Sequence, residues 1–525
     1  MQAIVDFEPR TAARMSDHVL KKTPPVSTLL LAVLLGLTAC GAPTEPPPDE
    51  PSDAGVVTDG GQEGPDAGED AGTVSAEERA RLETVQGWLD HAVQSEWTPG
   101  IAVAIVREDG EHVLTSGTLG WGNTRPVDAE TVFELGSVSK TFTSLTLAQA
   151  VGRGEAALGQ SAESLLPTGA TMPKGAGGEL ITLEHLATHH SGLPREPPGA
   201  TLNDPEHPYG QQGPDVLYGS LKNVTLSSVP GARFSYSNLG AGLLGHLTAR
   251  AAEVGSYEEL LLRRVLLPLG MKRTFINPPP DANVAEGNSE GGPVPPINFS
   301  MIEGAGAVRA SANDMVRYVR AQLHAQAGRD ELLPEGMGEA LRLAMTPRAQ
   351  TGVPGYGLGL GWFTGWPSAA QLPNAARVAQ HGGLTFGHRA MMAVSPDDAL
   401  GVVILTNSTT LPDEELAANL IRLWRGEQRT FHLRATIPVP EDVLQRYVGT
   451  YAISPSFSFT VTREADRLYV QGTGQPRIRF YAHAERAFHA RVVDATITFQ
   501  TGPSGEATSL TLQQNGQTLE APRQP

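Results

Sequence analysis

A serine and a lysine three positions apart could carry chemistry in this chain of 525 residues. Ser137 and Lys140 stand where a helix is expected to begin, and residues three apart share a helix face, so the amine can reach the hydroxyl. Lysine is rare here, with six in all, at positions 21, 22, 140, 174, 222 and 272. Unlike Arg, a Lys in a crowded or cationic environment can lose its proton and act as a base. Because the pair alone also fits an ordinary exposed helix, its meaning depends on the rest of the chain.

Two further segments carry the other groups that acyl transfer needs. Tyr236-Ser237-Asn238 is expected in a loop before a helix that begins near Leu239, and His381-Gly382-Gly383 is expected to be extended, just before a late hairpin. Acyl transfer needs a nucleophile, a base, a positioning amide and backbone N–H groups for an oxyanion. The three segments together can supply all four. The two glycines would also let a substrate backbone lie along the strand.

These segments, in this order and with these separations, resemble the S-x-x-K, Y-x-N and H-x-G motifs of the penicillin-recognising serine hydrolases. That family includes class C β-lactamases, low-molecular-weight DD-peptidases and related esterases. Further likeness lies in residues 181–194, 304–315 and 356–362, and the resemblance covers residues 85–410. It implies an α/β fold of the β-lactamase/transpeptidase type, with an antiparallel sheet flanked by helices and an all-α region. The early and late strands are expected to share that sheet.

The resemblance implies a catalytic role for three residues. Ser137 would be the acylated nucleophile, and Lys140 would ease its deprotonation. Tyr236 would be the base or the proton shuttle to the leaving group, with its phenolate favoured by the neighbouring Lys140. Whether the lysine or the tyrosine is the acylation base stays open.

The resemblance also implies which residues hold the substrate. Asn238 would hold the substrate amide, and the backbone N–H groups of Ser137 and Leu384 would form the oxyanion hole. The substrate-binding residues expected in this way are Asn238, His381, Gly382, Gly383 and Leu384. The predicted chemistry requires no cofactor and no metal.

One departure from the family bears on the substrate. Class C β-lactamases generally carry Lys-Thr-Gly where this chain has His381-Gly382-Gly383. His in place of Lys resembles the DD-peptidase and esterase members, and Gly382 removes a hydroxyl that helps to bind the carboxylate of a β-lactam or a peptide. Residues 186–199, which include Gly-Leu-Pro-Arg-Glu-Pro-Pro-Gly, most resemble a DD-carboxypeptidase/endopeptidase branch. The expected function is therefore hydrolysis of D-amino-acid cell-wall peptides through an acyl-enzyme. A β-lactamase or a carboxylesterase is the alternative, and a non-hydrolytic cell-wall-binding lipoprotein is a second one.

The C-terminal part of the chain has a different pattern. Short segments such as 457–461 and 510–512 alternate apolar and polar residues between turn signals, which is typical of a small all-β barrel. Residues 447–451 resemble part of the lipocalin-like domain that is appended to many such enzymes. Residues 75–430 are therefore expected to form the β-lactamase-like domain, and residues 440–525 a separate barrel domain.

The N-terminal part resembles a lipoprotein signal. An apolar run at residues 27–39 follows Lys21 and Lys22, and it is too short to span a bilayer comfortably. It ends in Leu37-Thr38-Ala39-Cys40, which resembles the bacterial lipoprotein cleavage box. The resemblance implies that residues 1–40 are a signal peptide and that Cys40, the only cysteine, carries a lipid anchor.

The segment after the signal predicts a tether and a location. Residues 41–74 hold nine acidic and no basic residues among Pro, Gly and Ala, a composition typical of a disordered linker. Gly41 stands where retention at the inner membrane usually favours Asp, so we expect the outer membrane, facing the periplasm. The net charge of −18 argues against a nucleic-acid partner. The expected partners are the membrane, through the lipid, and a peptide, amide or ester substrate.

Two other patterns are interpreted as structural. Gly287-Asn288-Ser289-Glu290-Gly291 matches the G-x-S-x-G nucleophile elbow, but its flanks predict neither the preceding strand nor the following helix, so a surface loop is expected. His185 and His189 are spaced as zinc ligands can be on a helix, but residue 186 is Leu rather than the Glu of H-E-x-x-H. A structural helix is expected there.

Overall fold

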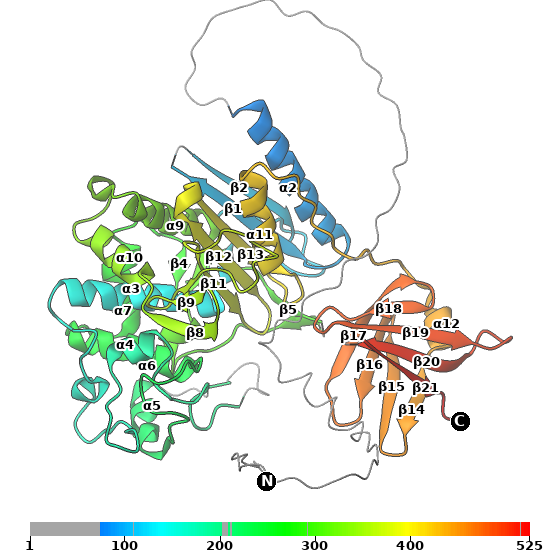
Figure 1. Cartoon of the computed structure of the whole chain (residues 1–525). Helices are drawn as coiled ribbons and strands as arrows, with labels where there is room; N and C mark the ends of the chain where they lie inside the picture. Colours follow the sequence, from blue (N-terminus) through cyan, green and yellow to red (C-terminus); the bar gives the residue numbers. More distant parts are fainter. Residues whose placement is uncertain (1–73, 109, 202–207, 210–212, 291, 515) are drawn as a thin grey trace, which may run out of the picture. The chain divides into compact units, whose positions relative to one another are not determined.

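The computed structural model describes residues 74–525, apart from 109, 202–207, 210–212, 291 and 515. In this part an α/β domain runs from α2 to α11, and a barrel domain of strands β14–β21 follows it in the sequence (Figure 1). The predicted signal peptide and the acidic tether lie outside the described residues. Among the residues that are described, none of the helices is both long and apolar enough to cross a membrane.

The main sheet of the α/β domain joins strands from both ends of that domain. Its order is β2-β1-β13-β12-β11-β10-β9-β8. All its neighbouring pairs are antiparallel, and β1 pairs directly with β13, so the predicted sheet with early and late strands is confirmed. Its strands are β1 (Gly100–Arg107), β2 (Glu111–Gly117), β8 (Ala349–Val353), β9 (Tyr356–Leu358), β10 (Phe363–Thr364), β11 (Ala379–Leu384), β12 (Arg389–Ser395) and β13 (Leu400–Thr406).

Helices cover both faces of this sheet (Figure 1). Because successive strand residues point to opposite faces, Ile101 and Val103 in β1 join one apolar core and Ala102 and Ala104 join the other. The first core also holds residues of α2 (Ala76–Gln94) and α11 (Asp413–Trp424), and the second holds residues of α9 (Ala312–Gln326). At the start of α2, the Ser75 hydroxyl accepts the N–H of Glu78 and caps the helix.

The helical region is centred on α3 (Ser139–Gly152), which packs against α6, α8 and α10. Every residue from Ser139 to Ala150 is buried, although many of them carry hydroxyls. Thr141 Oγ1 donates to Val138 O at 2.8 Å and Thr146 Oγ1 to Thr143 O at 2.7 Å, so these hydroxyls are satisfied by their own helix. The other helices here are α4 (Leu183–Ala187), α5 (Pro214–Ser220), α6 (Asn238–Ala251), α7 (Tyr257–Leu261), α8 (Glu303–Gly306) and α10 (Met337–Met345).

Two small sheets complete the domain. In one, β7 (Arg309–Ser311) lies between β3 (Val132–Glu134) and β4 (Thr274–Phe275). In the other, β5 (Gly287–Ser289) pairs with β6 (Gly292–Val294). The expected surface loop at residues 287–291 is therefore wrong: Gly287 and Asn288 are buried and form a hairpin strand, which is still not the strand–turn–helix of a nucleophile elbow.

The predicted barrel is confirmed by eight antiparallel strands that follow one another in sequence order. A bridge between Tyr451 and Arg523 brings the first and last strands together, and closure removes exposed sheet edges. The elements are α12 (Glu441–Gln445), β14 (Gly449–Ser454), β15 (Phe457–Glu464), β16 (Arg467–Gly472), β17 (Arg477–Ala484), β18 (Ala487–His489), β19 (Ala495–Thr501), β20 (Ala507–Gln514) and β21 (Gln517–Pro522).

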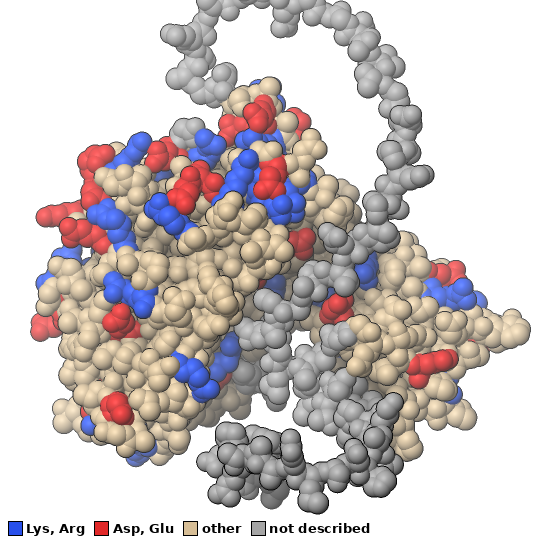
Figure 2. Space-filling model, viewed as in Figure 1, with Lys and Arg blue, Asp and Glu red and all other residues tan. Residues whose placement is uncertain are grey.

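Charges of both signs are mixed on the surface. On the face shown in Figure 2, basic and acidic side chains lie next to one another rather than in separate fields. Ion pairs such as Arg342–Asp330 and Arg377–Asp397 join partly or largely exposed side chains. Exposed pairs of this kind contribute about 0–1 kcal/mol each, so the α/β domain owes its stability chiefly to its two apolar cores.

Candidate active site

Ser137 lies in a 3₁₀ turn, Gly136–Val138, between β3 and the N-terminus of α3. Gly136 has φ +50°, and a Cβ there would lie 2.8 Å from the backbone nitrogen of Leu384. A side chain at this position would therefore force the turn away from β11. The turn places the serine at the positive end of a long buried helix, where negative charge is stabilised.

Lys140, in the first turn of α3, reaches the serine as the spacing predicts. Its Nζ lies 2.9 Å from Ser137 Oγ and donates to Ala305 O at 2.7 Å. The lysine is only 2% exposed, and burial lowers its pKa to about 7, with Glu196 opposing and Arg195 adding to the shift. A large fraction of this amine is therefore neutral near pH 7, as a base requires.

Tyr236 precedes α6, whose N-terminus is capped by the Ser237 hydroxyl accepting from Gly240 N at 2.9 Å. The Tyr236 hydroxyl interacts with the Ser137 side chain, and Lys140 Nζ lies 4.9 Å from the centre of the tyrosine ring. Burial raises the pKa of Tyr236 to about 12, although the interaction with Ser137 opposes this. The expected phenolate is therefore wrong at neutral pH, because burial outweighs the neighbouring positive charge.

The H-x-G segment is extended, as predicted, and forms half of β11. His381 is 2% exposed, and burial together with Lys140 lowers its pKa to about 3. Its ring packs against Phe363 at 5.3 Å and Tyr236 at 6.4 Å between ring centres. At neutral pH His381 is therefore uncharged and supplies no cation for a substrate carboxylate.

The two glycines of this segment have different surroundings. A Cβ on Gly382 would meet only Met391 Sδ, at 3.7 Å, whereas a Cβ on Gly383 would collide with the carbonyl oxygen of Leu135. Gly383 therefore lets β11 pack backbone to backbone against the turn of Ser137. We expected both glycines to make room for a substrate backbone. Gly383 has an additional role, because the absence of a side chain there allows close packing within the domain.

The expected oxyanion donors lie on this contact. Thr385 N donates to His388 O at 3.0 Å, and Leu384 is paired with Arg389 on β12. Because hydrogen-bonded and non-bonded pairs alternate in an antiparallel ladder, the N–H of Leu384 points away from β12, towards the edge of β11 beside Ser137. The backbone nitrogens of both predicted donors are therefore brought to one place.

A buried ion pair of Glu134 lies beside this contact. Glu134, at the end of β3, pairs with Arg309 at 3.0 Å and with His388 Nδ1 at 3.4 Å. Burial alone would raise the pKa of Glu134, but its interactions with His388 and Arg309 bring it to about 2. The carboxylate therefore ties β3, just before Ser137, to the turn that follows β11.

Sequence reasoning missed two residues of this site. His189 lies after the end of α4 with φ +58°, its ring centre is 4.3 Å from that of Tyr236, and its Nδ1 accepts from Ser237 N at 3.2 Å. The expected helix therefore holds His185 but not His189, because α4 ends at Ala187. Burial lowers the pKa of His189 well below its usual value, so it is a neutral acceptor behind the tyrosine.

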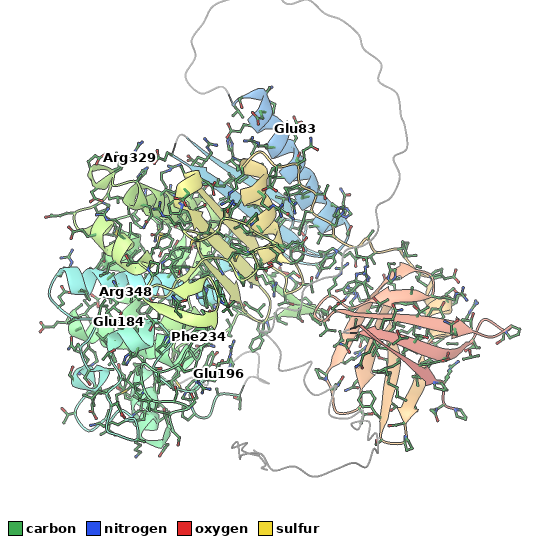
Figure 3. All side chains as sticks on the ribbon, viewed as in Figure 1. Glu83, Glu184, Glu196, Phe234, Arg329 and Arg348 are labelled. Atoms are coloured by element: carbon green, nitrogen blue, oxygen red, sulfur yellow. The ribbon has the colours of Figure 1, made fainter. Side chains whose placement is uncertain are left out.

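The second missed residue is Glu196, which Figure 3 labels in the same part of the domain as Phe234. Its Oε1 accepts from Asn238 Nδ2 at 2.8 Å and its Oε2 from the Tyr209 hydroxyl at 3.2 Å. The signal was present in Gly-Leu-Pro-Arg-Glu-Pro-Pro-Gly, where an acidic residue follows a basic one. The partner of Glu196, Asn238, could be identified only from the fold, which brings this loop to the start of α6.

Comparisons with known proteins agree with this geometry. A family model described as Beta-lactamase matches residues 85–423, and one described as Domain of unknown function (DUF3471) matches residues 433–522. A class C beta-lactamase structure has a TM-score of 0.58 and 24% identity, and the match covers 68% of this chain and 99% of that one. The fold is therefore the β-lactamase/transpeptidase fold.

Three relatives extend the comparison. A Beta-lactamase of Escherichia coli (strain K12) is 29% identical over 343 residues, covering 60% of this chain and 85% of that protein. D-alanyl-D-alanine-carboxypeptidase/endopeptidase AmpH of the same strain is 28% identical over 340 residues, covering 62% and 84%. Penicillin-binding protein 4* of Bacillus subtilis (strain 168) is 25% identical over 452 residues, covering 80% and 94%.

The fold and the site define a serine hydrolase of the β-lactamase and DD-peptidase type. Since the family model matches well over half of its length, the chain belongs to the beta-lactamase family.

Proposed function

We propose that this enzyme is a DD-peptidase that cleaves D-amino-acid cell-wall peptides through an acyl-enzyme on Ser137. The observation that carries the proposal is the Lys140 amine, which lies 2.9 Å from Ser137 Oγ and has a pKa of about 7. A base with this pKa at hydrogen-bond distance suits deprotonation of a serine at neutral pH. Similarity to a D-alanyl-D-alanine-carboxypeptidase/endopeptidase supports the peptide substrate.

In the proposed reaction, Ser137 Oγ attacks the carbonyl carbon while its proton passes to neutral Lys140. The N–H groups of Ser137 and Leu384 stabilise the oxyanion. The protonated Tyr236 hydroxyl, which interacts with Ser137, relays a proton to the leaving nitrogen as the C–N bond breaks. Asn238 holds the substrate amide. Water then attacks the ester, gives its proton back through the same groups and releases Ser137.

The neutral state of His381 bears on which peptide bond is cleaved. A terminal D-alanine carries a carboxylate, and a β-lactam carries one too, but His381 offers no positive charge to either near pH 7. An internal D-amino-acid bond in a cross-link does not need that charge. We therefore place endopeptidase action ahead of carboxypeptidase action and both ahead of β-lactam hydrolysis.

A carboxylesterase is the second candidate, and the same observation favours it. A simple ester presents neither a carboxylate to His381 nor a poor leaving group to Tyr236. Such an enzyme would use the same nucleophile and base, so the site alone supports it. The choice between the two candidates is a choice of substrate, which a direct assay decides.

The test is intact-mass spectrometry over time with benzylpenicillin, nitrocefin, a D-Ala-D-Ala peptide, a cross-linked peptide dimer and a short-chain ester. A long-lived penicillin adduct that is absent in Ser137→Ala, together with cleavage of the dimer, is the expected result. Rapid turnover of the adduct with hydrolysed nitrocefin would make the enzyme a β-lactamase. Ester hydrolysis without peptide cleavage would make it a carboxylesterase, and no reaction at all would leave a binding protein.

We also propose that Cys40, which lies outside the described residues, carries a lipid that anchors the enzyme to the outer membrane, facing the periplasm. The cleavage box that ends at Cys40 supports this proposal. In a detergent phase-separation assay the wild type is expected in the detergent phase and Cys40→Ala in the aqueous phase. Separation of inner and outer membranes on a density gradient then tests the location, and a wild type found in the aqueous phase would overturn the anchor.

A further inference from the structure

Glu196 stands beside the residue that is expected to hold the substrate amide, but it belongs to none of the three motifs. Its side chain is 18% exposed, so it is neither fully buried nor freely solvated. Each carboxylate oxygen has a partner: Asn238 Nδ2 donates to Oε1 at 2.8 Å, and the Tyr209 hydroxyl donates to Oε2 at 3.2 Å. Arg195 Nε lies 3.5 Å from Oε1 and is 62% exposed.

The bond from Asn238 fixes the orientation of its side-chain amide. An ionised carboxylate only accepts hydrogen bonds, so Nδ2 rather than Oδ1 must face Glu196. A rotation of the amide by half a turn would put oxygen against oxygen and would cost the charge-assisted bond, which is stronger than a neutral one. The remaining N–H and the carbonyl oxygen of Asn238 therefore have fixed directions before a substrate arrives.

We propose that Glu196 is a positioning residue of this site: its carboxylate holds the side-chain amide of Asn238 in one orientation and thereby makes the enzyme prefer acyl groups that carry an amide. This deepens the proposed function and rests on its acyl-transfer site. A substrate amide then meets a pre-oriented partner, and pre-orientation spares the free energy of ordering that partner on binding.

The same carboxylate has a separate electrostatic effect on the base. Its negative charge opposes the lowering of the pKa of Lys140. The charged or titratable groups around Lys140 are Glu196, Arg195, Ser137, Tyr236, His189 and His381, and of these both histidines are neutral near pH 7. Removal of the charge should lower the pKa of Lys140 and move the acid limb of the rate profile to lower pH.

The test compares two esters that both acylate a serine without a peptide bond being broken. The p-nitrophenyl ester of N-acetyl-D-alanine carries an acyl-side amide, and p-nitrophenyl acetate does not. The measured quantity is the ratio of their kcat/KM values at pH 8.5, where Lys140 is largely deprotonated in every variant. We expect Glu196→Ala to lower this ratio about 10-fold, as the loss of one oriented hydrogen bond implies.

Matched variants separate orientation from charge and from general damage. Asn238→Ala should lower the ratio as much as Glu196→Ala, and the double variant should lower it no further, since both act through one contact. Glu196→Gln can still accept the bond from Asn238 but can also donate to it, so it should lower the ratio less than Glu196→Ala does while it shifts the acid limb. Glu184→Gln, whose partner Arg348 lies 3.5 Å away and is labelled with it in Figure 3, should change neither.

Each contrary result is informative. A ratio that is unchanged in Glu196→Ala, or additive losses in the double variant, would overturn the positioning role even if D-peptides are cleaved. The expected ratios without any cleavage of D-peptides would instead overturn only the DD-peptidase proposal. A wild type that reacts with neither ester would overturn both.

Discussion

Lys140 owes its chemistry to its surroundings rather than to its type. An exposed lysine is almost fully protonated at neutral pH, but this one is 2% exposed, and burial brings its pKa to about 7. Tyr236, buried beside it, moves in the opposite direction, to about 12. Burial disfavours the charged form of both groups, so the lysine becomes the available base and the tyrosine keeps its proton.

The first prediction concerns the pH dependence of acylation. If neutral Lys140 is the base, kcat/KM should rise about tenfold per pH unit below pH 7 and level off above it. Lys140→Arg should lose at least about 100-fold at every pH, because a guanidinium does not deprotonate. The measurement is the rate of Ser137 acylation by a chromogenic ester between pH 5 and 9. A rate that falls between pH 7 and 9 would contradict this assignment.

At the scale of single residues, the sequence identified the types of the catalytic residues and the contact between Ser137 and Lys140, but not how deeply each side chain is buried. The spacing of Ser137 and Lys140 correctly predicted their contact, since three residues are nearly one helical turn. The state of Tyr236 was predicted wrongly because burial depends on elements distant in sequence. Glu196 was missed for the same reason: its partner Asn238 lies on another element, and only tertiary structure joins them.

At the scale of elements, the site depends on how closely β11 approaches the 3₁₀ turn of Ser137. Gly136 and Gly383 leave room for two backbones to meet, where a Cβ from either would touch the opposite chain. Glu134 braces this contact through Arg309 and His388. The sequence predicted a helix after Ser137 and an extended segment at residues 381–383, but the contact itself follows from small residues whose neighbours only the fold reveals.

The second prediction is that Gly383→Ala separates β11 from the turn. Its Cβ would collide with Leu135 O, so we expect acylation of Ser137 to slow by at least about 100-fold, as when an oxyanion donor is lost. Gly382→Ala is the matched control for folding, because its Cβ meets only Met391 Sδ at 3.7 Å. Its melting temperature should stay near that of the wild type, while that of Gly383→Ala falls. Equal melting temperatures and equal acylation rates for Gly383→Ala and the wild type would refute the role of this contact.

The third prediction concerns Glu134→Gln, which removes one charge from a buried pair. Breaking such a pair costs about 3–5 kcal/mol, so the variant should be markedly less stable at pH 7. Because the pKa of Glu134 is about 2 in the fold and 4.5 ordinarily, its contribution is present above pH 4.5 and is lost as the pH falls towards 2. Urea unfolding followed by circular dichroism should therefore show a difference that shrinks between pH 5 and 3. If the difference in stability between Glu134→Gln and the wild type did not depend on pH, the charge of Glu134 would not be its source.

At the scale of the whole molecule, the described chain consists of two domains that are built on different principles. The α/β domain buries a sheet between helices, and the barrel domain closes a sheet on itself. Period-two alternation was enough to predict the barrel, since its inward and outward residues alternate regularly. Closure depends on a long-range contact, between Tyr451 and Arg523, which periodicity does not encode.

The fourth prediction tests that closure. Arg523 donates to Val448 O at 2.6 Å, to Ala507 O at 3.2 Å and to Glu506 at 2.9 Å, so Arg523→Ala removes three hydrogen bonds. We expect a local cost of about 1–3 kcal/mol and amide hydrogen exchange about 10- to 100-fold faster in β14 and β21. Acylation of Ser137 should be unchanged, which an ester assay on the same sample checks. Faster exchange throughout the barrel without a preference for β14 and β21 would argue against closure at this residue.

The pairing of β1 with β13 also constrains how the enzyme is made. A ribosome delivers β1 early but β13 only when the α/β domain is almost complete, so the centre of the sheet cannot form during most of synthesis. An unfinished chain can already contain Ser137 and Lys140 while it still lacks β11, which must pack against them. Nascent chains that end before β11 therefore carry the nucleophile without the N–H of Leu384, the second oxyanion donor, and we expect them to lack hydrolytic activity.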